Sequence, residues 1–147
     1  MELLPFWNFI REFEEAYDYH RKKIMKSFEL SAIEVDVLAF VSNNPSLNTA
    51  ADVVRYKKIA KSHVSLAVKS LIDKGYLRKE VDEKDKKKYH LIPCEKAEVI
   101  VDFARRERDE FIKVIDQSIT EEDKQSFREV MLKIENSLKK EYELKEK

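Results

Sequence analysis

The stretch that decides the fold is Lys61-Ser62-His63-Val64-Ser65-Leu66-Ala67-Val68-Lys69-Ser70-Leu71-Ile72-Asp73-Lys74-Gly75. Its apolar residues recur at three- and four-residue steps, which predicts an amphipathic helix from about Ala60 to Lys74. Gly75 is the only glycine of the chain, and a glycine directly after a helix is typical of the left-handed C-cap conformation. The predicted inward face consists of Val64, Ala67, Val68, Leu71 and Ile72.

The opposite face of this helix carries short or hydrogen-bonding side chains, which suit a close approach to the edges of DNA bases. Leu66 is unusual on an exposed face, but a leucine can contact a thymine methyl group. Lysines near both ends of the face can reach phosphates. The residues predicted to contact DNA from this helix are Lys61, Ser62, His63, Ser65, Leu66 and Lys69.

Two helices are expected before the helix over residues 60–74. Ser31-Ala32-Ile33-Glu34 has the spacing of a capping box, and the helix that it starts should end at Asn43-Asn44-Pro45. Asn48 or Thr49 can cap a short helix through Arg55, followed by a turn over residues 56–58. The amides at that helix start, Asn48 and Thr49, are further candidates for DNA contact.

Two β-compatible runs follow, Tyr76 to Val81 and Lys87 to Ile92, with a charged segment over residues 82–86 between them. This pattern predicts a β-hairpin with a flexible basic tip. Such a tip can lie along the minor groove or the neighbouring backbone. Its candidate contacts are Lys84, Lys86 and Lys87.

Long amphipathic helices are expected on both sides of this unit, over residues 6–28, from Pro93 or Cys94 onward, and from Thr120. Their stripes are richer in aromatic and aliphatic residues than one small domain needs, which favours a dimer interface. His20 lies on the first stripe, where a core or interface role is expected. The stripe of Phe6, Trp7, Phe9, Phe13 and Tyr17 serves packing or lines an effector cavity. The predicted interface residues are Phe6, Phe9, Phe13, Phe127, Ile134, Leu138 and Tyr142.

Composition and charge agree with a mostly helical DNA-binding chain. The 147 residues suit one domain, 43% are hydrophobic, and one glycine and three prolines leave little material for turns. The formal net charge is zero, but residues 55–88 hold 12 basic and 5 acidic side chains, a net charge of +7. A positive region in an acidic scaffold is typical of nucleic-acid binding.

Other classes of function lack the residues they need. One cysteine and three scattered histidines give no metal-site spacing, a single glycine allows no phosphate loop, and no catalytic set is evident. His90 and Cys94 are close in sequence but fall on a strand and a helix start. We therefore expect no enzyme, no metal, no cofactor and no membrane partner. The lone cysteine and the lack of a signal-like start predict a cytoplasmic protein.

The order of these motifs resembles the MarR (multiple antibiotic resistance regulator) family over nearly the whole chain. Asp85-Lys86-Lys87 stands where that family has Asp-Arg-Arg in its wing, so the tip offers point charges instead of guanidinium forks. Cys94-Glu95-Lys96-Ala97 stands in place of Thr-Glu-Lys-Gly. The other matching motifs are Leu30-Ser31-x-x-Glu34-x-x-Val37-Leu38 and the run from Lys61 through Gly75-Tyr76-Leu77.

The resemblance implies a mainly α fold with a small β-hairpin wing (α+β). This is a winged helix-turn-helix with N- and C-terminal dimerisation helices. The expected DNA-binding lobe covers residues 31–92, and residues 1–28 and 94–147 form the dimerisation helices of an obligate homodimer. Such a homodimer binds double-stranded DNA at a pseudo-palindromic operator with half-sites ~10 bp apart or a multiple of that. The expected role is transcriptional regulation by repression, with a small-molecule effector as the candidate trigger of release.

Two alternatives stay open at this point. One is a winged-helix protein-interaction module without DNA binding, which would show an apolar or acidic outer face on the helix before Gly75. The other is a redox sensor based on Cys94. The alternative interpretation of Cys94 is an ordinary small residue at the start of a helix. His63 is either a base-contacting residue or an ordinary surface histidine.

Overall fold

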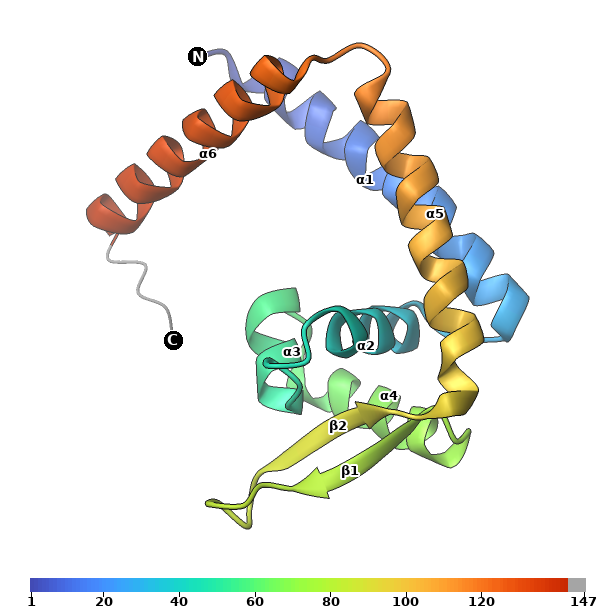
Figure 1. Cartoon of the computed structure of the whole chain (residues 1–147). Helices are drawn as coiled ribbons and strands as arrows, with labels where there is room; N and C mark the ends of the chain where they lie inside the picture. The colour runs from blue at the N-terminus through green and yellow to red at the C-terminus, as the bar shows by residue number, and fades with distance from the viewer. Residues whose placement is uncertain (143–147) are drawn as a thin grey trace. The chain divides into compact units, whose positions relative to one another are not determined.

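The computed structural model describes residues 1–142, and residues 143–147, the end of the predicted C-terminal dimerisation segment, lie outside the described residues (Figure 1). The chain divides into two compact units, residues 1–111 and 112–147, which are described separately. Their elements, in chain order, are α1 (Leu3–Phe28), α2 (Ala32–Asn43), α3 (Ala50–Lys57), α4 (Lys61–Asp73), β1 (Leu77–Val81), β2 (Tyr89–Pro93), the 3₁₀ turn η1 (Glu95–Ala97), α5 (Glu98–Asp116) and α6 (Glu121–Tyr142).

The core of the first unit forms where α2, α3 and α4 meet the two-stranded sheet. The predicted inward face of α4 is confirmed, since Val64 and Leu71 have no exposed surface and Ile72 packs at the edge of the core. The helices α2 and α3 contribute aliphatic residues from their own inward faces. Burial of each such side chain stabilises the fold by ~1.5–3 kcal/mol. The fully buried residues also include Val37, Leu38, Val41 and Val53.

Helix starts were predicted well from single residues, with one correction. Thr49 and Asp52 form a complete capping box at α3, and Thr120 and Asp123 bond reciprocally in the same way at α6. At α2 the Ser31 hydroxyl accepts from the Glu34 amide at 3.1 Å, as expected. The Glu34 carboxylate does not return to the cap, however. It accepts from Ser70 at 2.9 Å and Lys74 at 2.8 Å, so it ties α2 to the end of α4.

The end of α4 has the predicted left-handed glycine, with a φ of +80° at Gly75. The Tyr76 amide donates to the Leu71 carbonyl and the Gly75 amide to Ile72, which is a Schellman arrangement. Upstream, α3 runs two residues past the predicted end at Arg55. The turn therefore centres on Lys58, whose φ is +52°. This left-handed turn sets the angle at which α4 leaves α3.

The predicted hairpin is present, with antiparallel pairs from Leu77 opposite Pro93 to Val81 opposite Tyr89. β1 starts one residue later than predicted, and β2 runs from Tyr89 to Pro93 instead of Lys87 to Ile92, because the turn at the tip extends over residues 82–88. The fifth helix does not start directly at Cys94, since the turn η1 precedes α5. In Figure 1 the hairpin projects beyond the helices α2, α3 and α4.

The helices α1 and α5 contact each other through aromatic rings and through polar contacts of His20 and Lys23 with Glu107. Phe28 meets Phe103 edge-on at 5.4 Å between ring centroids, and Phe13 meets Phe111 at 5.2 Å. His20 Nδ1 lies 2.6 Å from Glu107 Oε2, and both side chains are 15% exposed. His20 is therefore partly buried between α1 and α5 and lies outside the core cluster, and an interface role for it stays a prediction.

The second unit contains the last turn of α5 and α6. Along the described part of α6, residues 121–142, no residue is buried. Its apolar stripe is open, with Phe127 55% and Leu138 45% exposed. None of the helices within residues 1–142 is both long and apolar enough for a membrane crossing.

Candidate nucleic-acid interface

The outward face of α4 is solvent-exposed along its whole length. Lys61, Ser62, His63, Ser65, Leu66 and Lys69 are all exposed, and Leu66 reaches 67%. The start of α4 has Ala60 as N-cap, with no side-chain hydrogen bond and no acidic residue in the first turn. Its first amides are therefore not capped by a side chain, and the positive end of the helix dipole is not neutralised. The face is polar, basic and accessible, which contradicts the apolar or acidic face expected of an interaction module.

The side chains of Asn48 and Thr49, predicted to contact DNA at the start of α3, also have partners within the protein. Thr49 Oγ1 and its backbone amide both bond the Asp52 carboxylate, at 2.7 and 3.1 Å. Asn48 is 9% exposed, and its Oδ1 lies 2.6 Å from His90 Nδ1. Its carbonyl accepts from the Leu91 amide at 2.8 Å, so the backbone of Asn48 lies beside β2. Asn48 thus connects the start of α3 to β2, while Thr49 caps α3.

Two carboxylates, those of Asp82 and Asp85, accept hydrogen bonds from backbone amides of the wing tip. Asp82 Oδ2 accepts from the amides of Lys84 and Asp85 at 3.0 and 2.9 Å. Asp85 Oδ1 accepts in turn from the Lys87 amide at 3.0 Å. These bonds fix the backbone, while the side chains of Lys84, Lys86 and Lys87 stay exposed. The three lysines thus extend from a defined turn.

His90, which sequence reasoning considered only beside Cys94, joins the tip to the helices. Its Nε2 lies 2.7 Å from Asp82 Oδ1, opposite the contact with Asn48. The His90 hydrogen bond, followed by the two tip amides, lowers the pKa of Asp82 from 3.8 to about 2. A polar residue in an otherwise apolar strand was the available signal, but its two partners lie 42 and 8 residues away.

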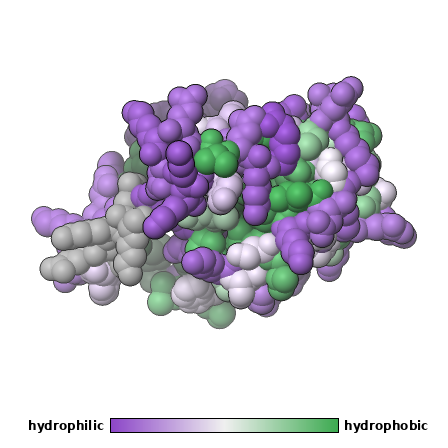
Figure 2. All heavy atoms as spheres, turned by 90° about the horizontal axis from the view of Figure 1, so that it is seen from below, coloured by the Kyte–Doolittle hydropathy of each residue, from purple (hydrophilic) through white to green (hydrophobic). Residues whose placement is uncertain are grey.

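The outward face of α4 and the wing tip lie on one side of the unit that α2, α3, α4 and the hairpin form. Figure 2 views that side from below the wing and α4 of Figure 1, and hydrophilic side chains surround a smaller apolar area. The base-facing candidates come from α4 and the phosphate-facing candidates from α4 and the tip. A helix with a neighbouring basic hairpin has the shape needed to enter one groove and to contact the adjacent backbone.

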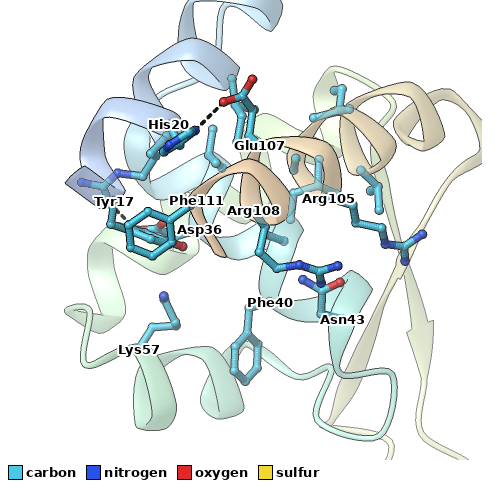
Figure 3. A pocket seen from close by; sticks show the side chains of 18 of the residues that line it. Tyr17, His20, Asp36, Phe40, Asn43, Lys57, Arg105, Glu107, Arg108 and Phe111 are labelled. Atoms are coloured by element: carbon cyan, nitrogen blue, oxygen red, sulfur yellow. Dashed lines mark hydrogen bonds and ion pairs between the residues drawn. The ribbon is translucent and has the colours of Figure 1, made fainter. Parts of the chain in front are cut away.

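A separate cavity of about 260 Å³ lies between α1, α2, α3 and α5 (Figure 3). Its lining combines apolar and charged side chains, and Tyr17 is the only member of the aromatic stripe among them. Lys57 points toward the space from α3, and Arg108 comes from α5. Volumes of roughly 300–1,000 Å³ are usual for ligand pockets, so this cavity lies just below that range.

Titratable groups in the wall of the cavity are perturbed. Burial raises the pKa of Asp36 despite its ion pair with Arg21, whose Nη1 lies 2.9 Å away. Burial, followed by the Asp36 charge, also raises the pKa of Tyr17. At Glu107, burial alone would raise the pKa, but hydrogen bonds from His20 and Lys23 lower it overall.

Cys94 lies in a shallower hollow that it shares with Ser42, Glu98 and Arg105. It is partly buried and is the only cysteine of the chain. Among residues 1–142, no group of three or more His, Cys, Asp or Glu side chains is placed to hold a metal ion.

Comparison with known proteins identifies the fold. Residues 30–97 match the family model described as "Winged helix DNA-binding domain". No curated protein matches the sequence. A MarR family transcriptional regulator from Silicibacter pomeroyi is 18% identical with a TM-score of 0.71, over 90% of this chain and 87% of that one. The MarR protein from Peptoclostridium difficile DA00132 is 22% identical with a TM-score of 0.70, over 94% and 92%.

A DNA complex is also among the similar structures. The S. aureus MepR–DNA complex has a TM-score of 0.76 at 16% identity, over 92% of this chain and 97% of that one. The chain therefore carries a winged helix DNA-binding domain, and its fold is the one found in MarR family transcriptional regulators, as the motifs indicated.

Proposed function

We propose that this chain, a winged helix DNA-binding domain within a MarR-type fold, regulates transcription as a homodimer on a pseudo-palindromic operator. The single observation that carries the proposal is the outward face of α4. One side of this helix is fully buried at Val64 and Leu71, while Ser62, Ser65 and Lys69 on the other side are exposed. A helix anchored on one face and polar on the other is suited to reading base edges in the major groove.

The chemistry of the side chains on this surface separates the residues expected to contact bases from those expected to contact phosphates. Ser62, His63, Ser65 and Leu66 are short or flat enough to meet base edges and thymine methyl groups. Lys61 and Lys69 on α4, with Lys84, Lys86 and Lys87 on the tip, neutralise phosphates. Each lysine is a point charge, so the tip supplies affinity more than sequence preference.

The second half of the proposal is the dimer. Phe6, Phe9 and Phe13 on α1 are 42%, 51% and 43% exposed, although they belong to an apolar stripe. On α6, the same holds for Phe127, Ile134, Leu138 and Tyr142, at 55%, 44%, 45% and 67%. Exposed apolar stripes of this length on a small chain indicate a protein interface. A second copy is the partner that would also supply a second recognition helix, one helical turn of DNA or a multiple of it away.

The decisive experiment is fluorescence anisotropy with DNA from upstream of the protein's own gene, at two salt concentrations. We expect saturable binding that weakens steeply as the salt concentration rises. Protein binding releases counterions from the DNA phosphates, and this release is less favourable at high salt. The double variant Ser62→Glu/Ser65→Glu places two carboxylates in the groove and should abolish binding, while circular dichroism shows the fold intact. Equal binding by this variant and the parent chain would rule out α4 as the reading helix.

A small molecule is proposed to release the DNA by binding in the cavity between α1, α2, α3 and α5. The cavity supports this because its wall joins the helices expected at the dimer interface to α2 and α3 of the winged helix domain. A ligand that binds one spacing of the recognition helices better than another shifts the population toward that spacing. Filling the cavity with Ala39→Trp or Ala104→Trp should leave operator binding unchanged and abolish release by any compound found to displace the parent protein. Continued release would place the effector elsewhere.

Redox control through Cys94 is the alternative regulatory mechanism, and its support is the partly exposed thiol beside Arg105 in one hollow. Peroxide treatment followed by anisotropy separates the two mechanisms. Abolished DNA binding in the parent chain but not in Cys94→Ser would establish the thiol as the sensor. Equal responses of the two proteins would exclude it.

A further inference from the structure

Glu34 of α2 holds the end of α4 at two points that lie about one helical turn apart. Its Oε1 accepts from Ser70 Oγ at 2.9 Å, and its Oε2 accepts from Lys74 Nζ at 2.8 Å. The Glu34 side chain is 10% exposed, so these bonds form in a site that is largely closed to solvent. Residues four apart face the same side of a helix. Two directional bonds on that side resist both rotation of α4 about its axis and a change of its tilt against α2.

The start of α4 lacks an anchor of this kind. Its N-cap, Ala60, forms no side-chain hydrogen bond. The inward residues of this half, Val64 and Ala67, are buried in the apolar core. Apolar contacts are non-directional, so they restrict small rotations less than hydrogen bonds do. The orientation of the base-facing residues therefore depends on the bonds at the far end of the helix.

The distance between the anchor and the base-facing residues magnifies any tilt of α4. Ser62 lies about two turns before Ser70, which is ~12 Å along the helix axis. A tilt of ~10° about Ser70 would move Ser62 by ~2 Å, whereas a hydrogen bond requires about 2.7–3.2 Å between its heavy atoms. Lysines reach phosphates through a flexible four-carbon stem and can follow such a movement. A tilt should therefore remove base contacts and spare phosphate contacts.

The same end of α4 is also bound to the segments that precede α2 and follow β2. Lys74 Nζ lies 3.4 Å from the carbonyl oxygen of Glu29, the left-handed C-cap of α1. Lys96 Nζ, from η1, donates to the Lys74 carbonyl at 2.7 Å. These bonds make the end of α4 the fixed point about which its start would tilt.

We propose that Glu34 is a positioning residue for base recognition, which holds α4 at the tilt that discrimination between the operator and other DNA requires. This inference rests on the proposed DNA-binding function. Glu34 is buried, so it acts through Ser70 and Lys74 and not by contact with DNA. Its loss should lower the ratio of operator affinity to nonspecific affinity. A domain that is merely less stable would lose both affinities in equal proportion, because the unfolded fraction binds neither duplex.

The test variant is Glu34→Leu, which removes both acceptor oxygens and keeps a side chain of similar size. The cap of α2 is retained, since the Ser31 hydroxyl accepts from the backbone amide of residue 34. The Lys74 side chain is 38% exposed and can turn to solvent, so no buried charge is left without a partner and the domain should fold. Glu34→Gln is the conservative variant, because its amide can donate to Ser70 Oγ and accept from Lys74 Nζ.

Asp36→Asn is the matched control on the same helix. The Asp36 side chain is 11% exposed, and its carboxylate pairs with Arg21 Nη1 at 2.9 Å. Asp36 is thus buried and ion-paired to nearly the same degree as Glu34, but its partner lies on α1 and not on α4. Removal of its charge should affect stability and leave the ratio of the two DNA affinities unchanged.

Fluorescence anisotropy measures the affinity for the operator and for a scrambled duplex of equal length and composition, at one salt concentration. In Glu34→Leu the ratio of the two affinities should fall at least about tenfold, which is within the range that one mismatched base pair costs. Glu34→Gln should restore most of the ratio. Adding Ser70→Ala and Lys74→Met to Glu34→Leu should cause no further decrease, because the anchor is already absent.

Three results would overturn the proposal. The first is an unchanged ratio in Glu34→Leu, and the second is an equal fall in Asp36→Asn, which would assign the loss to stability. The third is a further fall in the triple variant, since Ser70 and Lys74 would then act independently of Glu34.

A second measurement records the orientation of α4 in the free protein. Amide residual dipolar couplings give the angle between α2 and α4 in parent, Glu34→Leu and Asp36→Asn chains, and only Glu34→Leu should differ. The same angle in all three chains would overturn the positioning role, whatever the DNA binding. No binding to either duplex by any chain, together with a changed angle in Glu34→Leu, would remove the proposed function but retain the hold of Glu34 on α4.

Discussion

The helices α4 and α6 have the same kind of sequence signal and very different surroundings. Both carry apolar residues at helical spacing, yet α4 buries Val64 and Leu71 completely, while no residue is buried along the described length of α6. The apolar side of α4 is satisfied within its own chain, so its polar side is free for another molecule. The apolar side of α6 still lacks cover, so there the apolar side is the candidate binding surface.

The strongest test of this difference between α4 and α6 places charges on the apolar stripe of α6. Ile134→Glu/Leu138→Glu should convert the proposed dimer to monomers and raise the dimer dissociation constant at least ~100-fold, because each buried aliphatic side chain contributes about 1.5–3 kcal/mol and occurs twice in a symmetric dimer. Sedimentation equilibrium measures this constant.

The matched control is Leu66→Glu on α4, at a leucine that is 67% exposed compared with 45% for Leu138. It should leave the dimer intact and weaken DNA binding. An unchanged association constant in the α6 double variant would show that this stripe is not the interface.

The next largest effect concerns the two faces of α4. Leu71→Ala removes a side chain without exposed surface and should lower the free energy of unfolding by ~2–5 kcal/mol. Leu66→Ala, on the outward face of the same helix, should change it by less than ~0.5 kcal/mol. Urea denaturation followed by circular dichroism compares the two. Equal decreases would mean that Leu66 packs against something in solution and that the outward face is not free.

A smaller effect tests the lysines assigned to phosphates. Lys69→Ala and Lys86→Ala should each weaken DNA binding on every sequence and reduce the slope of log K against log salt by ~0.9, because each variant leaves one phosphate without its lysine. Lys133→Ala on α6 is the matched control and should leave the slope unchanged. Ser65→Ala should instead alter base preference at constant slope, which a panel of operator variants would detect. An equal decrease in affinity for all three lysine variants would indicate nonspecific charge attraction.

The smallest effect is the pH dependence of the wing tip. Because the pKa of Asp82 in the folded chain, about 2, is below its ordinary value of 3.8, the carboxylate stabilises the tip fully above pH 3.8 and no longer does so once pH has fallen through about 2. Carboxyl carbon-13 titration should show this midpoint. In His90→Ala the midpoint should move upward but stay below 3.8, since the amides of Lys84 and Asp85 remain. A midpoint unaffected by the substitution would show that His90 does not hold Asp82.

Local features could be predicted from the sequence because their causes lie within a few residues. The spacing of Val64, Val68 and Leu71 defined α4, and Gly75 marked its end within one residue. The hairpin and the boxes at Thr49 and Thr120 followed the same logic. The outward residues of α4 were also correctly placed, because the far side of an amphipathic helix is fixed once its inner side is known.

Errors arose where a side chain had a choice between a near and a distant partner. Glu34 was assigned to its own helix cap, but Ser70 and Lys74 lie on the buried side of α2 and hold its carboxylate. The assignment of Asn48 and Thr49 to DNA stays a prediction, but sequence spacing did not show that the Asn48 side chain bonds the distant His90. A partly buried polar group takes the partner that fills its site, and sequence spacing does not show which partner that is.

The sequence by itself therefore determined the helices, the wing and the polar face of α4. The spacing of apolar residues along the chain is enough to show which segments form helices and strands. Tertiary structure alone decided the cavity beside Tyr17 and the bridge through His90. Each of these depends on atoms that do not follow one another in the chain, and only packing of the core brings the more distant segments within hydrogen-bond distance.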